Sequence, residues 1–217
     1  MAEKTLSAGI ANSLTGGTLA AISEESENTI TIMKRYNLDW LIENFETEKR
    51  IKFLFFWGNQ KDRNGNITST CFSQWWISPF IVNNITYQTA EHWMMANKAL
   101  LFNDQEIYNK ILVASSPGEA KDLGREIQNF DQNIWKNHRF EIVVQGNIHK
   151  FSQHKDLLQF LFDTKERVLV EASPVDTIWG IGLTAESEKA KNPLLWNGQN
   201  LLGFALMKVR DILRNRN

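Results

Sequence analysis

Short apolar runs alternate with polar segments along the chain, and their spacing predicts both strands and helices. The run IKFLFFWG at residues 51–58 is mostly apolar and stops at a glycine, which is typical of a buried strand. Residues 71–89 contain two extended runs around Asn83 and Asn84. Because asparagine tolerates the left-handed backbone of a tight turn, we predict a hairpin there.

Helix signals precede this strand and dominate the chain after the hairpin. Asn37 is a suitable N-cap for a helix over residues 38–50. Ser116, Pro117 and Glu119 match a capping box with proline at the first helical position, so a helix is predicted to begin there. The remaining predicted elements are helices at 133–153 and 155–164, a strand at 167–173, and a closing helix at 200–217 capped by Asn200.

This pattern predicts an α+β fold, a compact helix-rich single domain with a few short strands. A chain of 217 residues with 42% hydrophobic content is long enough to build one sizeable core. The first 35 residues are rich in Ser, Thr, Ala and Gly and have no sustained period. We therefore predict a partly helical N-terminal extension over residues 1–50, followed by the domain at 51–217.

The charge balance excludes a strong overall attraction to nucleic acid or to an anionic membrane. The chain has 24 basic and 25 acidic residues, a formal net charge of -1, so any nucleic-acid contact is expected to be local. No run approaches the roughly 20 apolar residues of a membrane span. The single Cys71 cannot form an internal disulfide, and the cysteine pairs of a structural zinc site are missing. We expect a cytoplasmic protein without a metal, a cofactor or a membrane contact.

The segment TAEHWMMANKALLF, residues 89–102, predicts a helix that is apolar on almost every side yet contains Glu91 and Lys98. At about 100° per residue these two side chains fall within roughly 20° of each other, two turns apart. A helix that is apolar all round is normally buried, and buried charges need a partner or a function. The rise of about 10 Å is too long for a relaxed ion pair, so the space between them is a candidate substrate site.

Structural explanations exist for the same residues. From spacing alone, Lys98 is more commonly a lysine whose stem covers apolar surface while its amine meets water. Glu91 stands in the first turn, where a carboxylate favours the helix dipole. His92 is expected to be a structural histidine, because no second histidine stands at metalloprotease spacing.

A second candidate site is EASPVDTIWGIGL, residues 171–183. Gly180 and Gly182 allow close approach of the backbone to a ligand or to another strand. Trp179 offers a flat face to a base or sugar, and Asp176 can act as an acid or base or hold a ribose hydroxyl. The structural alternative makes Asp176 a turn residue and Trp179 a core residue.

Several blocks together resemble the NADAR family, the YbiA-like N-glycosidases, in type, order and spacing from about Phe53 to Asn215. They are FLFFWG, SPFIVNNITYQTAEHWMMANKALLF, ASSPGEAKDLGREI, VEASPVDTIWGIGL and GQNLLGFALMKVRDIL. The resemblance implies a helix-rich α+β domain that hydrolyses N-glycosidic bonds to ribose. The family patterns E-H-x-x-x-A-x-K and D-x-x-W-G-x-G fall on Glu91, His92, Ala96, Lys98, Asp176, Trp179, Gly180 and Gly182.

The resemblance also suggests roles for the charged residues. Breaking a ribosyl C–N bond develops positive charge at the anomeric carbon, so one carboxylate can stabilise it while another acid protonates the leaving base, roles that suit Glu91 and Asp176. Lys98 in an apolar pocket is a competent amine nucleophile, which fits the lysine-imine route of the family. Lys121 and Arg125 stand at i and i+4 on the predicted helix, where they are candidates to bind a phosphate, although exposed bases usually face water.

Two positions depart from the family pattern. Gln74 in FSQW replaces the asparagine that many relatives have in L-S-N-F, and Ile181 stands between the two glycines, where some members have an acid. The second departure argues against activity on riboflavin intermediates. The extension at 1–50 has no counterpart in the minimal family domain.

Three hypotheses follow for function. The leading one is removal of ADP-ribose from guanine, so that the partner is ADP-ribosylated guanine in a nucleic acid or a nucleotide. The second is hydrolysis of phosphorylated ribosylaminopyrimidine intermediates of riboflavin synthesis. The third is a non-catalytic ADP-ribose reader, against which the complete set of Glu91, Lys98 and Asp176 argues.

Overall fold

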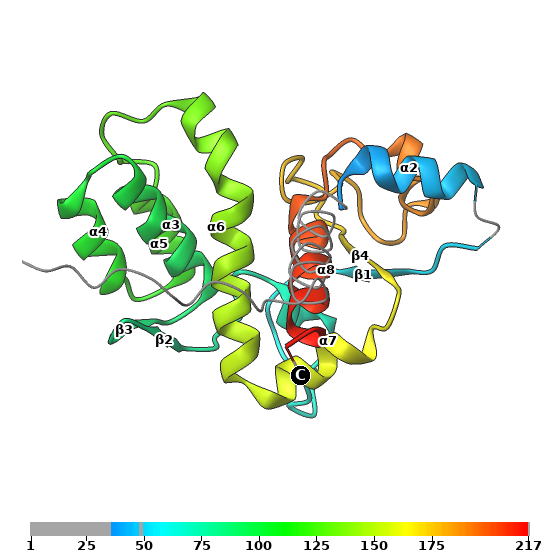
Figure 1. Cartoon of the computed structure of the whole chain (residues 1–217), viewed down its shortest axis with the longest axis horizontal. Helices are drawn as coiled ribbons and strands as arrows, with labels where there is room; N and C mark the ends of the chain where they lie inside the picture. Colours follow the sequence, from blue (N-terminus) through cyan, green and yellow to red (C-terminus); the bar gives the residue numbers. More distant parts are fainter. Residues whose placement is uncertain (1–35, 48–49, 217) are drawn as a thin grey trace, which may run out of the picture. The chain divides into compact units, whose positions relative to one another are not determined.

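Helices make up most of the chain that the computed structural model describes, which comprises residues 36–47 and 50–216 (Figure 1). The prediction for the first 35 residues lies outside this described part. The elements are α2 (Leu38–Thr47), β1 (Phe53–Phe56), η1 (Ser69–Phe72), β2 (Phe80–Val82), β3 (Ile85–Tyr87), α3 (Ala90–Leu101), α4 (Gln105–Leu112), α5 (Pro117–Leu123), α6 (Gln132–Gln153), α7 (Lys155–Asp163), β4 (Val168–Glu171), η2 (Glu188–Lys191), η3 (Pro193–Leu195) and α8 (Leu201–Arg214). The predicted α+β, helix-rich domain with few short strands is confirmed.

The strands form two small sheets. β1 and β4 pair in parallel, with Phe53 opposite Val168 and Phe56 opposite Glu171. The carboxyl ends of both strands therefore lie at the same end of this sheet. β2 and β3 form the predicted antiparallel hairpin. Asn83 and Asn84 occupy its turn with φ of 50° and 64°, the left-handed values that asparagine accepts.

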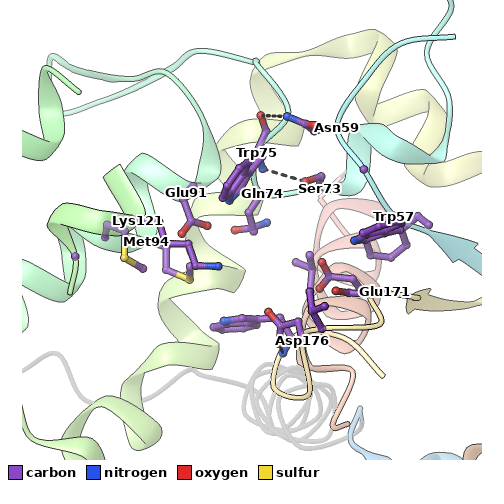
Figure 2. A pocket seen from close by; sticks show the side chains of 18 of the residues that line it. Trp57, Asn59, Ser73, Gln74, Trp75, Glu91, Met94, Lys121, Glu171 and Asp176 are labelled. Carbon is purple, nitrogen blue, oxygen red and sulfur yellow. Dashed lines mark hydrogen bonds between the residues drawn. The ribbon is translucent and has the colours of Figure 1, made fainter. Parts of the chain in front are cut away.

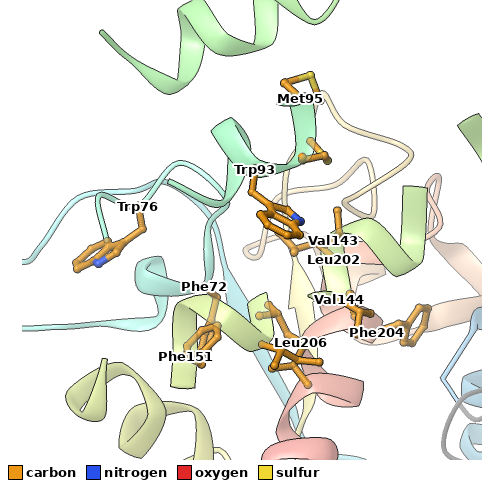
Figure 3. Packing of buried hydrophobic residues seen from close by; sticks show 14 of the residues in the cluster. Phe72, Trp76, Trp93, Met95, Val143, Val144, Phe151, Leu202, Phe204 and Leu206 are labelled. Atoms are coloured by element: carbon orange, nitrogen blue, oxygen red, sulfur yellow. The ribbon is translucent and has the colours of Figure 1, made fainter. Parts of the chain in front are cut away.

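The core joins α3, α6 and α8. α6 packs against α3 on one side and against α8 on the other, and α8 also covers β4 (Figure 1). Trp93 of α3, Val143 of α6 and Phe204 of α8 are among the buried side chains of this core (Figure 3). The long central helix α6 therefore ties the element that carries Glu91 to the sheet that ends at Glu171.

α3 is buried along most of its length, as its composition predicted. The hydroxyl of Thr89 caps it by accepting from the backbone N–H of His92. The ring nitrogens of His92 lie 2.8 Å from the Thr89 hydroxyl and 3.1 Å from the Ala114 carbonyl oxygen. Both nitrogens thus have partners, and His92 is structural, as expected. Leu100 is exposed on the outer side of the helix.

Two predicted caps differ in detail. At α5 the Ser116 hydroxyl accepts from the Glu119 N–H at 3.1 Å, but the Glu119 carboxylate accepts from the N–H of Ser115 rather than that of Ser116. Asn200 occupies the N-cap position of α8, as predicted, but its side chain forms no capping hydrogen bond. Its φ of 53° is left-handed, and its side chain instead accepts from the Glu171 N–H at 3.0 Å and donates to the Leu169 carbonyl at 2.9 Å.

The segment before β1 packs on the rest of the described chain. α2 contacts η3, and the Tyr36 hydroxyl donates a 2.5 Å hydrogen bond to Asp211 of α8. Residues 36–47, which the sequence analysis assigned to the N-terminal extension, therefore contact the domain. Over residues 36–47 and 50–216, no helix is both long and apolar enough to cross a membrane.

Candidate active site

A cavity of about 500 Å³ opens between the α3–α5 region and the edge of the sheet where β1 and β4 end (Figure 2). Its wall is built by the segments after β1 and η1, by α3 and α5, and by the loop that follows β4. The structure gathers most of the predicted site residues here: Glu91, Lys98, Lys121, Arg125, Asp176 and Trp179. The two sequence blocks thus contribute to one site.

Gly180 and Gly182 do not line this cavity. A Cβ on Gly180 would lie 2.8 Å from the carbonyl oxygen of Glu171, so this glycine allows the loop to pack against the end of β4. Gly182 has a φ of 67°, a backbone angle that residues with a side chain rarely adopt. The sequence predicted that these glycines let the backbone approach either a ligand or another strand. The structure agrees with approach to a strand, because neither glycine lines the cavity.

Glu91 is almost completely buried, with 3% of its surface exposed. Its backbone N–H donates to the Gln74 carbonyl at 2.9 Å, which fixes the start of α3 against the segment after η1. Burial raises the pKa of the Glu91 carboxyl to about 7, although the Lys121 charge and a hydrogen bond with the Trp75 side chain oppose the rise. The carboxyl can therefore exchange a proton near neutral pH.

Glu171 also lines the cavity, and sequence reasoning gave it no role. Burial raises its pKa to about 8, and the charges of Asp176 and Glu91 act in the same direction. A signal was present in the sequence, because Glu171 is an acid placed directly after the apolar strand VLV. Its position beside Asp176, however, depends on how the following loop folds back.

Asp176 has a role in the loop as well as a place in the cavity. Its Oδ1 accepts from the N–H groups of Ile178 and Trp179, both at 2.8 Å, which is the turn that the structural alternative predicted. Trp179 is partly buried and packs against the core while one part of it faces the cavity. The structural and functional interpretations of this loop are thus compatible.

Lys98 does not pair with Glu91. In the described part of the chain, its Nζ donates a 2.7 Å hydrogen bond to the Gly124 carbonyl and lies 4.4 Å from the centre of the Phe130 ring. Burial lowers the pKa of the Lys98 amine, and the nearby Arg125 charge lowers it further. An amine that loses its proton more readily is a better nucleophile at neutral pH.

The two basic residues predicted to bind phosphate, Lys121 and Arg125, differ in their surroundings. Lys121 lies 5.8 Å from the centre of a Trp75 ring, and it is the charge that acts most strongly on Glu91. Arg125 is mostly exposed and forms an ion pair with Asp122 at 2.5 Å. Lys121 is therefore the basic residue better placed to contact a ligand inside the cavity.

The two departures from the family pattern have different structural consequences. Gln74 lines the cavity, and its Nε2 donates to Asn147 at 3.3 Å, while its buried Oε1 has no hydrogen-bond partner in the described part of the chain. Ile181 is completely buried, does not line the cavity, and donates its N–H to the Glu171 carbonyl. An acid at position 181 would not join the cavity lining in this fold, so this departure says little about the substrate.

The arrangement as a whole combines carboxyl groups of three residues with two lysines and several tryptophans. Acids beside a sugar can stabilise positive charge at the anomeric carbon and move protons, and aromatic faces can stack on a base. Among the described residues, no cluster of three His, Cys, Asp or Glu side chains is placed to hold a metal ion.

Comparisons with known proteins agree with this chemistry. The NADAR domain model matches residues 55–214. N-glycosidase R617 of Acanthamoeba polyphaga mimivirus is 44% identical over 165 residues, which cover 74% of this chain and 95% of that protein. The NMR structure of the E. coli protein YbiA superimposes with a TM-score of 0.59 at 25% identity and covers 78% of this chain and 89% of its own. The chloroplastic riboflavin biosynthesis protein PYRR of Zea mays is 33% identical over 133 residues, which cover 58% of this chain and 20% of that protein.

Proposed function

The chain belongs to the NADAR domain family of N-glycosidases, hydrolases that act on N-glycosyl bonds, and we propose that its own reaction releases ADP-ribose from guanine. The observation that supports this reaction best is the meeting of Glu91, Asp176 and Lys98 in one cavity. These residues come from α3 and from the loop after β4, and each contributes a group that ribosyl C–N cleavage needs.

The proposed division of roles follows from the surroundings of each group. Two backbone hydrogen bonds to one oxygen hold the Asp176 side chain in place, so it suits the role of stabilising positive charge at the anomeric carbon. Lys98 supplies the amine that attacks this carbon and forms an imine with the opened sugar. Glu91, with its pKa raised to about 7, exchanges the proton that this attack displaces.

Features at the cavity wall and rim favour a nucleotide-like substrate. Lys121 offers a positive charge to a phosphate group, and Trp179 offers a face for a sugar or base. At the rim, Trp57 is 58% exposed and can stack on a base that remains attached to a larger molecule. A cavity of about 500 Å³ falls within the range that holds small organic ligands.

A second candidate is hydrolysis of a phosphorylated ribosylaminopyrimidine. It is favoured by the similarity to the riboflavin biosynthesis protein of Zea mays, of which the matched region covers 20%. The same acids and lysine would serve, since the bond cleaved is again a ribosyl C–N bond. The smaller substrate would not need a stacking surface at the rim.

One experiment separates these candidates. The full chain is incubated with an oligonucleotide that contains ADP-ribosylated guanine and, separately, with a ribosylaminopyrimidine phosphate, and the products are identified by mass spectrometry. We expect free ADP-ribose and an intact guanine oligonucleotide from the first reaction. Cleavage of the ribosylaminopyrimidine phosphate alone would favour hydrolysis of the riboflavin intermediate as the function. Binding of ADP-ribose without release from either would identify a non-catalytic reader.

A further inference from the structure

Glu171 lines the cavity, and its backbone is held in a fixed position. Its backbone N–H donates to Asn200 at 3.0 Å, its carbonyl accepts from Ile181 at 2.9 Å, and the residue pairs with Phe56 in the parallel sheet. Its Oε2 atom, in contrast, is buried and has no hydrogen-bond partner in the described part of the chain. A rigid backbone thus presents a polar atom whose partner the described protein does not supply.

The other two acids of the cavity are held differently. Asp176 accepts two backbone N–H bonds, and Glu91 has the Trp75 side chain as a hydrogen-bond partner and Lys121 as its strongest charged neighbour. Both contacts of Glu91 lower its pKa, although burial raises that pKa to about 7. The strongest charges acting on Glu171 are those of Asp176 and Glu91, which are both negative and favour a neutral carboxylic acid.

Other charged groups near β4 do not reverse this effect. Lys121 of α5 is the one cation among the charges that act on Glu171, and its effect is smaller than that of either acid. Helix α8 packs against β4, but its two buried cations bond elsewhere, Lys208 to Glu141 and Arg210 to Thr164 and Arg167. Of the two glutamates in the cavity, Glu171 is therefore more strongly favoured in its protonated form than Glu91.

The sheet register places Glu171 next to the rim. Because Phe56 pairs with Glu171, the residue that follows Phe56, Trp57, leaves the sheet at the same edge. In Figure 2 the Glu171 carboxyl lies between Trp57 and Asp176. A base stacked on Trp57 would bring its glycosidic nitrogen towards Glu171 while the sugar extends towards Asp176.

We propose that Glu171 is a further catalytic residue, the general acid that protonates the leaving nitrogen as the ribosyl C–N bond breaks. The electron pair of that bond stays on the nitrogen, which takes the Glu171 proton, and Glu171 becomes a carboxylate. The Lys98 amine forms the new bond to the anomeric carbon, and Glu91 accepts the proton that the amine loses. Glu91 passes this proton to the ring oxygen as the C–O bond of the sugar ring breaks and the imine forms. One water then hydrolyses the imine, which returns the free lysine, and the proton released in this step restores Glu171. This assignment rests on the proposed N-glycosidase reaction.

The kinetic test compares wild type, Glu171→Gln and the control Glu188→Gln, whose side chain is exposed on η2 and does not line the cavity. Single-turnover base release is measured from pH 5 to 10. We expect Glu171→Gln to lose roughly 10²- to 10⁴-fold in rate, the usual contribution of a general acid, with substrate affinity retained. The wild-type rate should fall above about pH 8, and the variant should lose this alkaline decrease. A variant with wild-type rate, or a slow variant that keeps the alkaline decrease, overturns the assignment.

A measurement without substrate separates this proposal from the proposed function. Infrared difference spectra of wild type minus Glu171→Gln report whether the Glu171 carboxyl is protonated at pH 7. We expect the carbonyl band of a neutral carboxylic acid, which should disappear as the pH is raised above about 8. Carboxylate bands at pH 7 overturn the general-acid assignment even if the wild type is active. A neutral carboxyl in a wild type that releases no base from any ribosyl substrate would instead contradict the proposed function.

Discussion

The Nζ atom of Lys98 lies 2.7 Å from the carbonyl oxygen of Gly124, the residue that follows the last turn of α5. Carbonyl groups at the end of a helix favour a positive charge, so this bond stabilises the ammonium form. Burial and the Arg125 charge act in the opposite direction and lower the pKa of the amine. To attack a sugar, the amine must leave Gly124 and lose a proton, and a bound substrate is the natural trigger for both changes.

Neutral, nearly isosteric replacements of the two predicted carboxylates should keep the fold and lose activity. In Asp176→Asn the side-chain oxygen can still accept from the N–H groups of Ile178 and Trp179, so the turn should persist. Glu91→Gln changes the volume little. We expect each variant to release base roughly 10²- to 10⁴-fold more slowly than wild type. Circular dichroism checks the fold, and wild-type turnover in either variant would remove that residue from the mechanism.

Removal of the Trp179 ring should weaken substrate binding. A lost base stack costs about 1–3 kcal/mol, so the Kd for ADP-ribose should rise by roughly five-fold to 150-fold in Trp179→Ala. Trp40→Ala is a suitable control, since Trp40 belongs to α2 and does not line the cavity. Titration calorimetry on both variants gives the comparison. An unchanged Kd in Trp179→Ala would make Trp179 a core residue only.

The raised pKa of Glu171 predicts how the stability of the fold depends on pH. Folding raises the pKa of Glu171 from 4.5 to about 8, so between these values the folded chain binds more protons than the unfolded chain. Stability contributed by this group is present below about pH 4.5 and is lost as the pH rises to about 8. Urea unfolding at pH 5, 7 and 9 should therefore show a smaller loss in Glu171→Gln than in wild type. Equal losses would mean that the Glu171 carboxyl is not buried as described.

Asn200 predicts a stability effect outside the cavity. It is completely buried, and its side chain bonds to both Glu171 and Leu169 of β4. Asn200→Gly keeps the left-handed backbone and loses these bonds, which should lower the free energy of unfolding by about 1–3 kcal/mol. Asn200→Ala should cost roughly 1 kcal/mol more, because alanine is strained at a φ of 53°. Equal stability of the two variants would contradict the backbone part of this explanation.

Local pattern was sufficient for much of the fold. The hairpin at Asn83 and Asn84 and the start of α5 at Pro117 follow from residue types at adjacent positions, and both are where the sequence predicts them. The role of Asn200 was not predictable from such signals, because its partners lie in β4, about thirty residues earlier, with separations of 29 and 31. A cap residue and a residue that bonds to a distant strand look alike in the sequence.

The same limit applies to the site. Glu91 and Lys98 were found because a charge is conspicuous in an apolar helix, and Asp176 was found through its motif. Glu171 was overlooked because an acid at the end of a strand is usually solvated. Its importance depends on the pairing of β1 with β4 and on the loop that brings Asp176 back beside it, and these contacts join distant parts of the chain.

The central claim, that Lys98 acts as the nucleophile of an N-glycosidase, is tested most directly by trapping the imine. Borohydride is added during turnover of ADP-ribosylated guanine, and the digested protein is examined by mass spectrometry. We predict a stable adduct of the sugar on the peptide that contains Lys98. Lys98→Arg should show neither adduct nor turnover, because a guanidinium stays protonated and is a poor nucleophile. Near-normal turnover by Lys98→Arg, with no adduct trapped on the wild type, would contradict the claim.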